Sequence, residues 1–225
     1  MNSVIIAAGG SGTRMNSAIP KQFISVSGKP LIVYTLSVFN DHKDIDEIIV
    51  ACHEQYIDEL KDWILFYGLN KVARIVPAGK SRQESVYNGL NAVSLKTKIV
   101  LIHDAARPLV TGSIIGENIL AAELHGAVTT AVISDDTLVK SENGLFIDEP
   151  LSREMIYRIQ TPQSFKYKII KDAHEKNKYN PPAADDCGLV SDSGGKIAIV
   201  KGDKINFKIT TEDDLSLFEK IINSK

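Results

Sequence analysis

The sequence has little cysteine and no long apolar run. Cys52 and Cys187 are the only cysteines and lack CxxC spacing, which excludes a disulfide scaffold and predicts a reduced, cytoplasmic setting. The five histidines are scattered and form no zinc pattern. The opening MNSVIIAAGG is apolar for only a few residues before glycine, too short for a signal peptide or a membrane span. We therefore expect no membrane partner.

An excess of charge of either sign is also absent. Lys plus Arg number 26 and Asp plus Glu number 28, so the net charge of −2 gives no support for nucleic acid as a partner. Apolar residues make up 44 % of the chain and charged residues 24 %, which predicts a folded protein. The length of 225 residues favours one domain, covering residues 1–225.

Apolar, β-branched runs alternate with amphipathic stretches along the chain. This order predicts an α/β fold with a mostly parallel sheet, helices on both faces and right-handed crossovers in a Rossmann-like layer. Late strands and a closing helix complete the expected order. Buried strands are expected at 3–8, 48–52, 73–76, 99–103 and 127–133, late strands at 197–200 and 207–209, and helices at 31–40, 54–67, 81–93, 113–124 and 211–222.

Two segments interrupt this rhythm. Residues 138–140 (LVK) and 145–147 (LFI) flank SENG, which predicts a small hairpin. The pattern fits an interface arm and an extra surface hairpin equally well. Residues 179–183 (YNPPA) are expected to form a loop, because two successive prolines prevent a helix.

The segment AAGGSGTRMNSAIPK follows the first expected strand. Gly9, Gly10 and Gly12 allow backbone N–H groups to approach phosphates closely. Arg14 and Lys21 add two cations, which suit a polyphosphate. The segment is neither a Walker loop nor a dinucleotide fingerprint, because methionine stands where the third glycine of GxGxxG would be. A purely structural turn is the alternative.

The strings GGSGTRM and PKQF resemble the opening signature of cytidylyltransferases that activate small polyol phosphates. The most similar families are the 2-C-methyl-D-erythritol 4-phosphate and ribitol-5-phosphate cytidylyltransferases, which share a Rossmann-like nucleotidyltransferase fold. The resemblance implies that the loop wraps CTP and that Arg14 and Lys21 stabilise the α-phosphate and the leaving pyrophosphate. It implies nucleotide contacts from Ala7, Ala8, Gly9, Gly10 and Gly12.

Two later motifs extend the resemblance. AGKSRQESVYNGL matches the second nucleotide motif, which implies that Gly79, Arg82 and Ser85 bind the nucleotide; read alone, it is a capped helix start. HDAARP follows the strand KIVLI and implies that Asp104 and Ala105 contact the nucleotide. A carboxylate at a strand end is also a suitable Mg²⁺ ligand, so we expect Asp104 to hold magnesium.

The same string supplies Arg107, which is expected to bind the substrate phosphate or to hold the neighbouring carboxylate. An internal Asp–Arg pair that only shapes the loop is the alternative. His103 is expected to be structural. Lys80 stands where an acidic residue is common in the resembled family, and Ala184 stands where the family often has threonine.

The remaining substrate contacts rest on the resemblance alone. It implies that Arg153 and Lys208 position the polyol phosphate for attack, with Thr137 and Thr161 as further contacts. It also implies a homodimer, in which an arm at about 134–160 presents Arg153 to the neighbouring subunit. Without the resemblance, both cations would be routine exposed side chains.

These residues predict a reaction without a protein nucleophile. The substrate phosphate attacks the α-phosphate of CTP, and the enzyme positions the reactants and neutralises charge. The motif HDAARP favours methylerythritol phosphate as substrate, whereas the triplet AGG favours ribitol phosphate; we rank the former first. A nicotinamide-dependent oxidoreductase and a non-catalytic nucleotide sensor are the alternatives from other classes.

Overall fold

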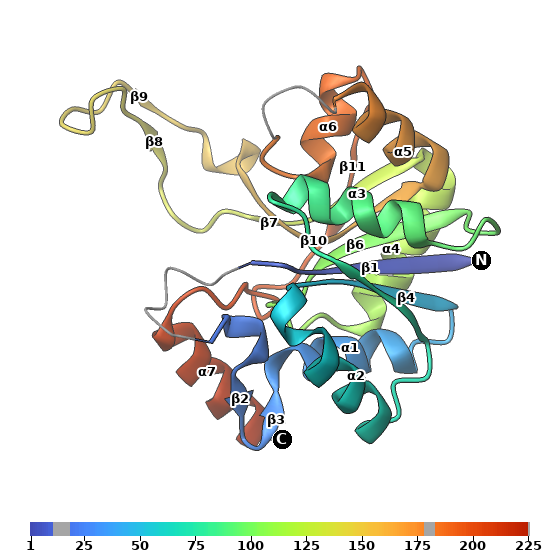
Figure 1. Ribbon diagram of the computed structural model, residues 1–225. Helices are drawn as coiled ribbons and strands as arrows, with labels where there is room; N and C mark the ends of the chain where they lie inside the picture. The colour runs from blue at the N-terminus through green and yellow to red at the C-terminus, as the bar shows by residue number, and fades with distance from the viewer. Residues whose placement is uncertain (11–18, 178–182, 225) are drawn as a thin grey trace.

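A seven-stranded sheet forms the centre of the molecule, which Figure 1 shows as a computed structural model. The structure describes residues 1–10, 19–177 and 183–224. The strands are β1 (Asn2–Ala8), β4 (Glu47–Cys52), β5 (Val72–Pro77), β6 (Ile99–Asp104), β7 (Ala127–Ile133), β10 (Tyr157–Lys166) and β11 (Ala198–Lys201). Their order is β11-β7-β10-β6-β1-β4-β5, and β10 alone runs antiparallel to its neighbours. The predicted α/β class with a mostly parallel sheet is confirmed.

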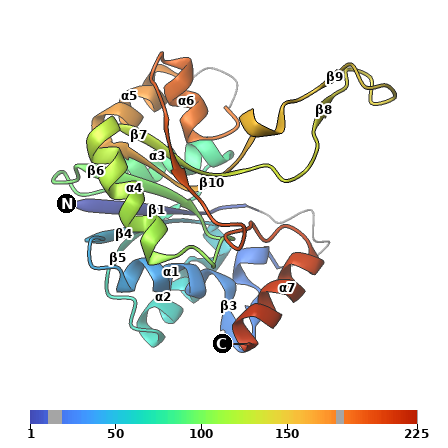
Figure 2. The ribbon, with the colours of Figure 1, turned by 180° about the vertical axis from the view of Figure 1, so that it is seen from behind.

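Helices cover both faces of the sheet, as the views from front and back show (Figures 1 and 2). One face carries α1 (Leu31–Asp41), α2 (Ile57–Phe66) and α4 (Gly112–His125). The other face carries α3 (Arg82–Ala92), α5 (Tyr167–Lys176) and α6 (Asp186–Asp192). The short hairpin β2 (Ser25–Val26) and β3 (Lys29–Pro30) packs with α7 (Glu212–Asn223) in a separate apolar cluster.

The central strand β1 divides the two cores by its alternation. Val4 and Ile6 point into the core under α1, α2 and α4, whereas Ile5 points into the core under α3. Gly89 of α3 packs directly on this strand, because a Cβ at Gly89 would lie 2.6 Å from the Ile5 side chain. The close approach brings the amino-terminal end of α3 to the carboxyl end of β1. Ser81 caps that end by accepting a hydrogen bond from the Glu84 N–H at 3.0 Å.

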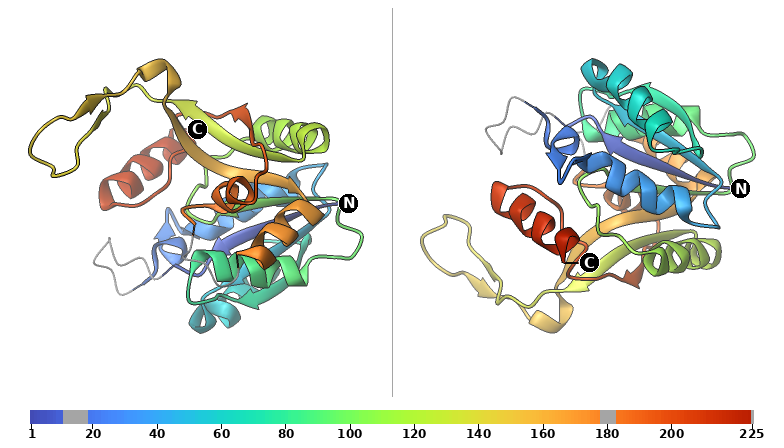
Figure 3. Two further views of the ribbon diagram at one scale, coloured as in Figure 1. Left: turned by 90° about the horizontal axis from the view of Figure 1, so that it is seen from above. Right: turned by 90° about the horizontal axis from the view of Figure 1, so that it is seen from below.

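A long arm leaves the sheet between β7 and β10 and projects from the body of the molecule (Figures 1 and 3). Its hairpin pairs β8 (Val139–Lys140) with β9 (Glu149–Pro150). The prediction of a second hairpin strand at 145–147 is wrong, because these residues lie in the loop between β8 and β9. Their side chains are 68 to 80 % exposed, so the arm presents apolar surface to solvent.

Other element predictions need correction. Residues 207–209 form no strand; the Ile209 N–H instead donates to the Ala106 carbonyl at 2.9 Å, and the Ile209 side chain packs near α7. The strand predicted as buried at 73–76 lies in β5 at the sheet edge and is largely exposed or half-buried. Strand β10 and helices α5 and α6 were not predicted. The loop predicted at 179–183 lies almost entirely outside the described residues.

Candidate active site

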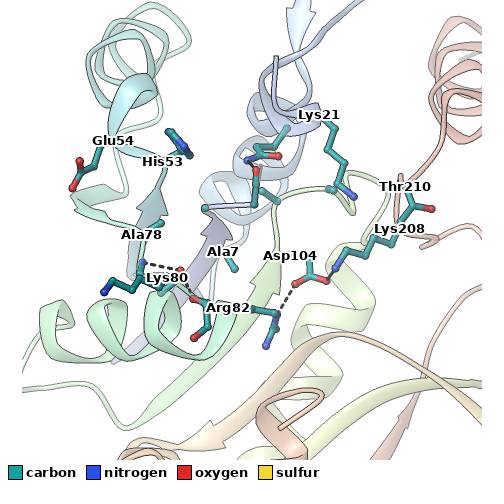
Figure 4. Close-up of a pocket in the computed structure, with 18 residues that line it drawn as sticks. Ala7, Lys21, His53, Glu54, Ala78, Lys80, Arg82, Asp104, Lys208 and Thr210 are labelled. Atoms are coloured by element: carbon teal, nitrogen blue, oxygen red, sulfur yellow. Dashed lines mark hydrogen bonds and ion pairs between the residues drawn. The ribbon is translucent and has the colours of Figure 1, made fainter. Parts of the chain in front are cut away.

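A cavity of about 630 Å³ opens at the carboxyl edge of the sheet (Figure 4). Ala7 lies in the last two residues of β1 and Asp104 ends β6, while His53 and Ala78 follow β4 and β5. Ligands of open α/β sheets bind at this edge. Most of the residues predicted to bind nucleotide or substrate phosphate line the cavity: Ala7, Gly9, Gly10, Lys21, Gly79, Arg82, Ser85, Asp104, Ala105 and Lys208.

Asp104 is the electrostatic centre of this cavity. Its Oδ1 lies 3.2 Å from Arg82 Nε, and its Oδ2 lies 2.7 Å from Lys208 Nζ and 3.9 Å from Arg107 Nε. Burial opposes ionisation of this carboxyl, but the charges of Arg82 and Lys208 outweigh it and hold the pKa of Asp104 well below its usual range. Arg82 also pairs with Asp186, so three cations face two carboxylates and one positive charge is left over, which suits a phosphate ligand.

Two predicted substrate contacts lie behind Asp104 in this chain. Arg107 is largely buried, and its Nη1 donates to the Asn206 carbonyl at 2.7 Å; burial lowers the pKa of Arg107. Thr161 Oγ1 accepts the Asp104 N–H at 3.1 Å and lies 3.1 Å from His103 Nδ1. Both side chains therefore support the loop that carries the carboxylate, an arrangement in line with the internal Asp–Arg alternative.

His103 completes this support. Its Nε2 lies 3.1 Å from the Arg107 carbonyl, so Nε2 carries a proton and Nδ1 accepts from the Thr161 hydroxyl. The ring is fully buried against Phe39, and burial lowers the pKa of His103 to about 4. A neutral imidazole in this position has a structural role.

The described part of the first glycine loop is held by Gln22, a residue that the sequence analysis did not single out. Its Nε2 donates to the carbonyls of Ala8 and Gly10 at 2.8 and 2.7 Å. Ala8 itself is buried, and its side chain does not line the cavity. Gly9 is required sterically, since a Cβ there would collide with Ala78. The string PKQF was the available signal for Gln22.

Two residues of the first loop, Gly12 and Arg14, lie outside the described residues. Their predicted roles therefore stay predictions.

The second motif forms a compact turn at the start of α3. The Gly79 N–H donates to Ser85 Oγ at 3.0 Å, and that hydroxyl donates to the Ser81 carbonyl at 2.8 Å. The Lys80 N–H donates to the Glu84 carboxylate at 2.7 Å. A Cβ at Gly79 would collide with Glu84, so the turn requires glycine. The turn thus places backbone and hydroxyl groups at the cavity wall.

Comparison with known proteins identifies the family. The family model for 2-C-methyl-D-erythritol 4-phosphate cytidylyltransferase matches residues 2–224. A protein of that name from Clostridium botulinum (strain Okra / Type B1) is 49 % identical over 98 % of this chain and 97 % of its own length. One from Clostridium novyi (strain NT) is 42 % identical over 99 % and 97 %. This chain belongs to the 2-C-methyl-D-erythritol 4-phosphate cytidylyltransferase family.

Solved structures agree with this assignment. The 4-diphosphocytidyl-2C-methyl-D-erythritol synthase of Anaerococcus prevotii superposes with a TM-score of 0.88 at 30 % identity, covering 99 % of this chain and 98 % of the other. The 2-C-methyl-D-erythritol 4-phosphate cytidylyltransferase of Thermus thermophilus gives a TM-score of 0.79 at 31 % identity, covering 97 % and 98 %. The predicted family and its Rossmann-like nucleotidyltransferase fold are confirmed.

In this cytidylyltransferase chain, Arg153 and Thr137 lie on the arm and do not line the described cavity. Arg153 Nη2 donates to Thr137 Oγ1 at 3.0 Å, and both side chains are exposed. The two arm residues thus form a unit of their own, outside the cavity of their own chain.

The cavity also contains carboxylates that could bind a divalent metal ion together with the phosphates of a nucleotide. Asp104 and Glu54 are the carboxylates among its described lining residues. Within the described ranges, no group of three or more His, Cys, Asp or Glu side chains could hold a metal ion. Mg²⁺ typically binds one or two carboxylates together with substrate phosphates and water, so these residues fit it.

Two further observations bear on the chain's setting. Among the helices of the described residues, none has the length and apolar content needed to cross a bilayer. Cys52 and Cys187 are both buried and unpaired, and burial raises the pKa of Cys52 to about 12. Neither thiol is therefore a reactive group.

Proposed function

We propose that this protein condenses CTP with 2-C-methyl-D-erythritol 4-phosphate to give the CDP-polyol and pyrophosphate. The observation that carries the proposal is the pairing of Arg82 and Lys208 with one buried carboxylate, in a cavity that Lys21 also lines, at the carboxyl edge beside a glycine loop. The relatives with 42 to 49 % identity carry the name of this activity. Family membership excludes the oxidoreductase hypothesis.

The chemistry follows from the charges. An oxygen of the substrate phosphate attacks the α-phosphorus of CTP and forms the new P–O bond. The bond to the bridging oxygen of the β-phosphate breaks, its electron pair stays on that oxygen, and pyrophosphate leaves. Lys21, with Arg14 as predicted, neutralises the charge that develops at the α-phosphate and on the leaving group. Lys208 holds the attacking phosphate.

We infer that Asp104 holds Mg²⁺ together with the nucleotide phosphates. When bound, the ion supplies charge neutralisation at phosphate oxygens. The Asp104 carboxylate is ionised, which metal binding requires, because Arg82 and Lys208 keep its pKa low. Lys208 Nζ is its nearest partner at 2.7 Å, and this amine would be available to phosphate if the carboxylate held the ion.

We further propose that two chains form the working enzyme, in the cytoplasm. Arg153 and Thr137 stand on an arm whose loop exposes Leu145, Phe146 and Ile147. Exposed apolar side chains on a projecting hairpin are typical of interaction surfaces. A second chain would cover them and receive Arg153 at its cavity. The buried thiols agree with a reducing compartment.

The decisive experiment measures pyrophosphate release from CTP and Mg²⁺ with methylerythritol 4-phosphate and with ribitol 5-phosphate, side by side. We expect release with the first substrate and a much lower kcat/KM with the second. A preference for ribitol phosphate would favour the alternative raised by the AGG triplet. Saturable CTP binding with no release from either substrate would leave a nucleotide sensor.

A further inference from the structure

Arg82 lies between two carboxylates, only one of which belongs to the cavity lining. Its Nε is 3.2 Å from Asp104 Oδ1, and its Nη1 is 2.5 Å from Asp186 Oδ2. Asp186 begins α6, 104 positions along the chain, and its side chain is 1 % exposed. In the part of the chain that the structure describes, no partner is found for Nη2. Two fixed contacts of a planar guanidinium determine where its third nitrogen points.

A second buried side chain fixes Asp186 in turn. His174 in the last turn of α5 has Nε2 3.2 Å from Asp186 Oδ1, and its side chain is also 1 % exposed. An ionised carboxylate only accepts, so this imidazole nitrogen donates. The His174 ring stacks near Tyr87 of α3, at 6.1 Å between centroids. Gln163 of β10 accepts the Asp186 N–H at 3.2 Å. Arg82 of α3 and His174 of α5 therefore hold the Asp186 carboxylate, and β10 holds the backbone of the same residue.

Burying ionisable side chains in this way opposes folding, so we expect the arrangement to serve the function of the site. Burying a carboxylate and an imidazole is unfavourable, and replacing such a pair by apolar residues is often neutral or stabilising. Burial alone would raise the pKa of Asp186, but Arg82 and His174 lower it, so the group remains an anion. The chain thus keeps a fixed negative charge directly behind a cation that faces the cavity.

We propose that Asp186 and His174 are positioning residues that hold the Arg82 guanidinium toward the phosphates of the bound nucleotide. The inference rests on the proposed function, because it assigns the ligand of Arg82 as CTP. Asp186 fixes Nη1, Asp104 fixes Nε, and Nη2 is left for a phosphate oxygen. Arg82 then meets the nucleotide without losing side-chain freedom on binding.

The test is the affinity for CTP of the variant Asp186→Asn, measured by calorimetry without polyol phosphate and by KM in the full assay. The variant removes the negative charge that holds the guanidinium, and a charged hydrogen bond corresponds to a change of at most about 10- to 100-fold, so we expect the CTP dissociation constant and KM to rise by up to that factor. The KM for the polyol phosphate should stay unchanged. A residue that only stabilises the fold would not separate the two KM values.

The matched control is Glu47→Gln. Glu47 is also a buried carboxylate, accepting from Ser3 Oγ at 2.8 Å and from the Ser94 N–H at 3.0 Å, but it lies at the opposite edge of the sheet. We expect it to lower the melting temperature without changing CTP affinity. If both variants leave CTP affinity at the wild-type value, the inference is wrong.

Two further variants test the route through Arg82. In an Arg82→Ala background, Asp186→Asn should change CTP affinity no further, whereas independent effects would contradict positioning. His174→Gln retains an N–H donor and should bind CTP more tightly than His174→Leu. If the wild-type protein itself binds no CTP, the proposed function fails; if it binds CTP and Asp186→Asn does not differ, only this inference fails.

Discussion

At Lys21, charge and fold can be separated experimentally. The side chain lines the cavity from a short 3₁₀ turn, Lys21–Phe23, and the buried residues of that turn are Gln22 and Phe23. We expect Lys21→Ala to lower kcat by about 10²- to 10³-fold, the usual effect of removing one group that stabilises a transition-state charge. The melting temperature should hardly change. Comparable losses of turnover and stability would instead assign the lysine a structural role.

His103 gives the protein a pH dependence of stability. Burial lowers its pKa to about 4 in the folded state, against an ordinary value of 6.5. The unfolded chain therefore binds a proton more readily, and the contribution to stability is complete above pH 6.5 and lost as pH falls through 4. Its size is about 3 kcal/mol, from about 1.4 kcal/mol per pH unit.

The measurement is urea unfolding between pH 7 and pH 4 for the wild type and for His103→Gln. The difference in free energy of unfolding between the two should shrink as the pH falls, because the variant has no imidazole to protonate. Curves that remain parallel across this range would show that His103 does not titrate on unfolding as expected.

At the level of elements, two glycine-to-alanine substitutions in helices should change the free energy of unfolding in opposite directions, because only Gly89 packs closely against β1. Gly89→Ala would place a Cβ 2.6 Å from Ile5 Cγ2 in the core, so we expect a loss of about 1 to 3 kcal/mol. Gly116→Ala in α4 meets only His42 at 3.8 Å and should gain about 0.5 to 1 kcal/mol from helix propensity. Chemical unfolding measures both; a gain at Gly89 would contradict the close approach.

The first half of the fold was predictable because its elements follow local patterns. Buried parallel strands read as apolar runs, and the helices between them start at caps such as Ser81. Strand β10 was not predicted because its buried half, Gln160 to Ser164, is mostly polar. These residues are buried because neighbouring strands lie on both sides of them. The segment around Ile209 has the composition of a strand but packs against α7, which no local pattern reveals.

The candidate site divides in the same way. Its glycines, Asp104 and Lys208 could be found from motifs, and the structure brings the described ones together at one edge. The pairing of Arg82 with Asp186 could not be found, because the two residues are 104 positions apart and no spacing rule relates them. Arg107 shows the converse. It belongs to the motif HDAARP, but its Nη1 donates to the Asn206 carbonyl and supports the protein side of the Asp104 segment.

For the whole molecule, the proposed dimer predicts a mass near twice 24.7 kDa in sedimentation experiments. Shortening the arm by replacing residues 138–151 with a tight turn should give monomers and abolish turnover. CTP binding should survive, because the described cavity contains no arm residue. A shortened chain that still sediments as a dimer would place the subunit contact elsewhere.

Mixing inactive variants tests whether the cavity is shared. Lys21→Ala removes a cavity residue and Arg153→Ala removes an arm residue, so each alone should be inactive. In a mixed dimer, one of the two sites would contain both intact residues, and an exchanged equal mixture should regain about a quarter of wild-type activity. Arg153→Ala subunits that show no complementation would place the arginine at its own chain's site.

The total charge of the molecule conceals a local separation. Four cations and two carboxylates line the described cavity, Lys21, Lys80, Arg82 and Lys208 against Glu54 and Asp104. The cavity therefore has an excess of two positive charges, whereas the whole chain has a net charge of −2. Such a separation attracts an anionic nucleotide to one edge of a molecule that is otherwise acidic.

Because β10 runs antiparallel to β7, the two ends of the arm join the sheet next to each other. The arm leaves the sheet at the end of β7 and returns at the start of β10. These two strand ends are neighbours, because Ile133 lies opposite Tyr157. A segment whose two ends lie side by side can be replaced by another segment, since the strands on either side keep their register. In the proposed dimer, exchanging the arm between relatives should change which chains pair, while the described cavity keeps its own lining residues, none of which lies on the arm.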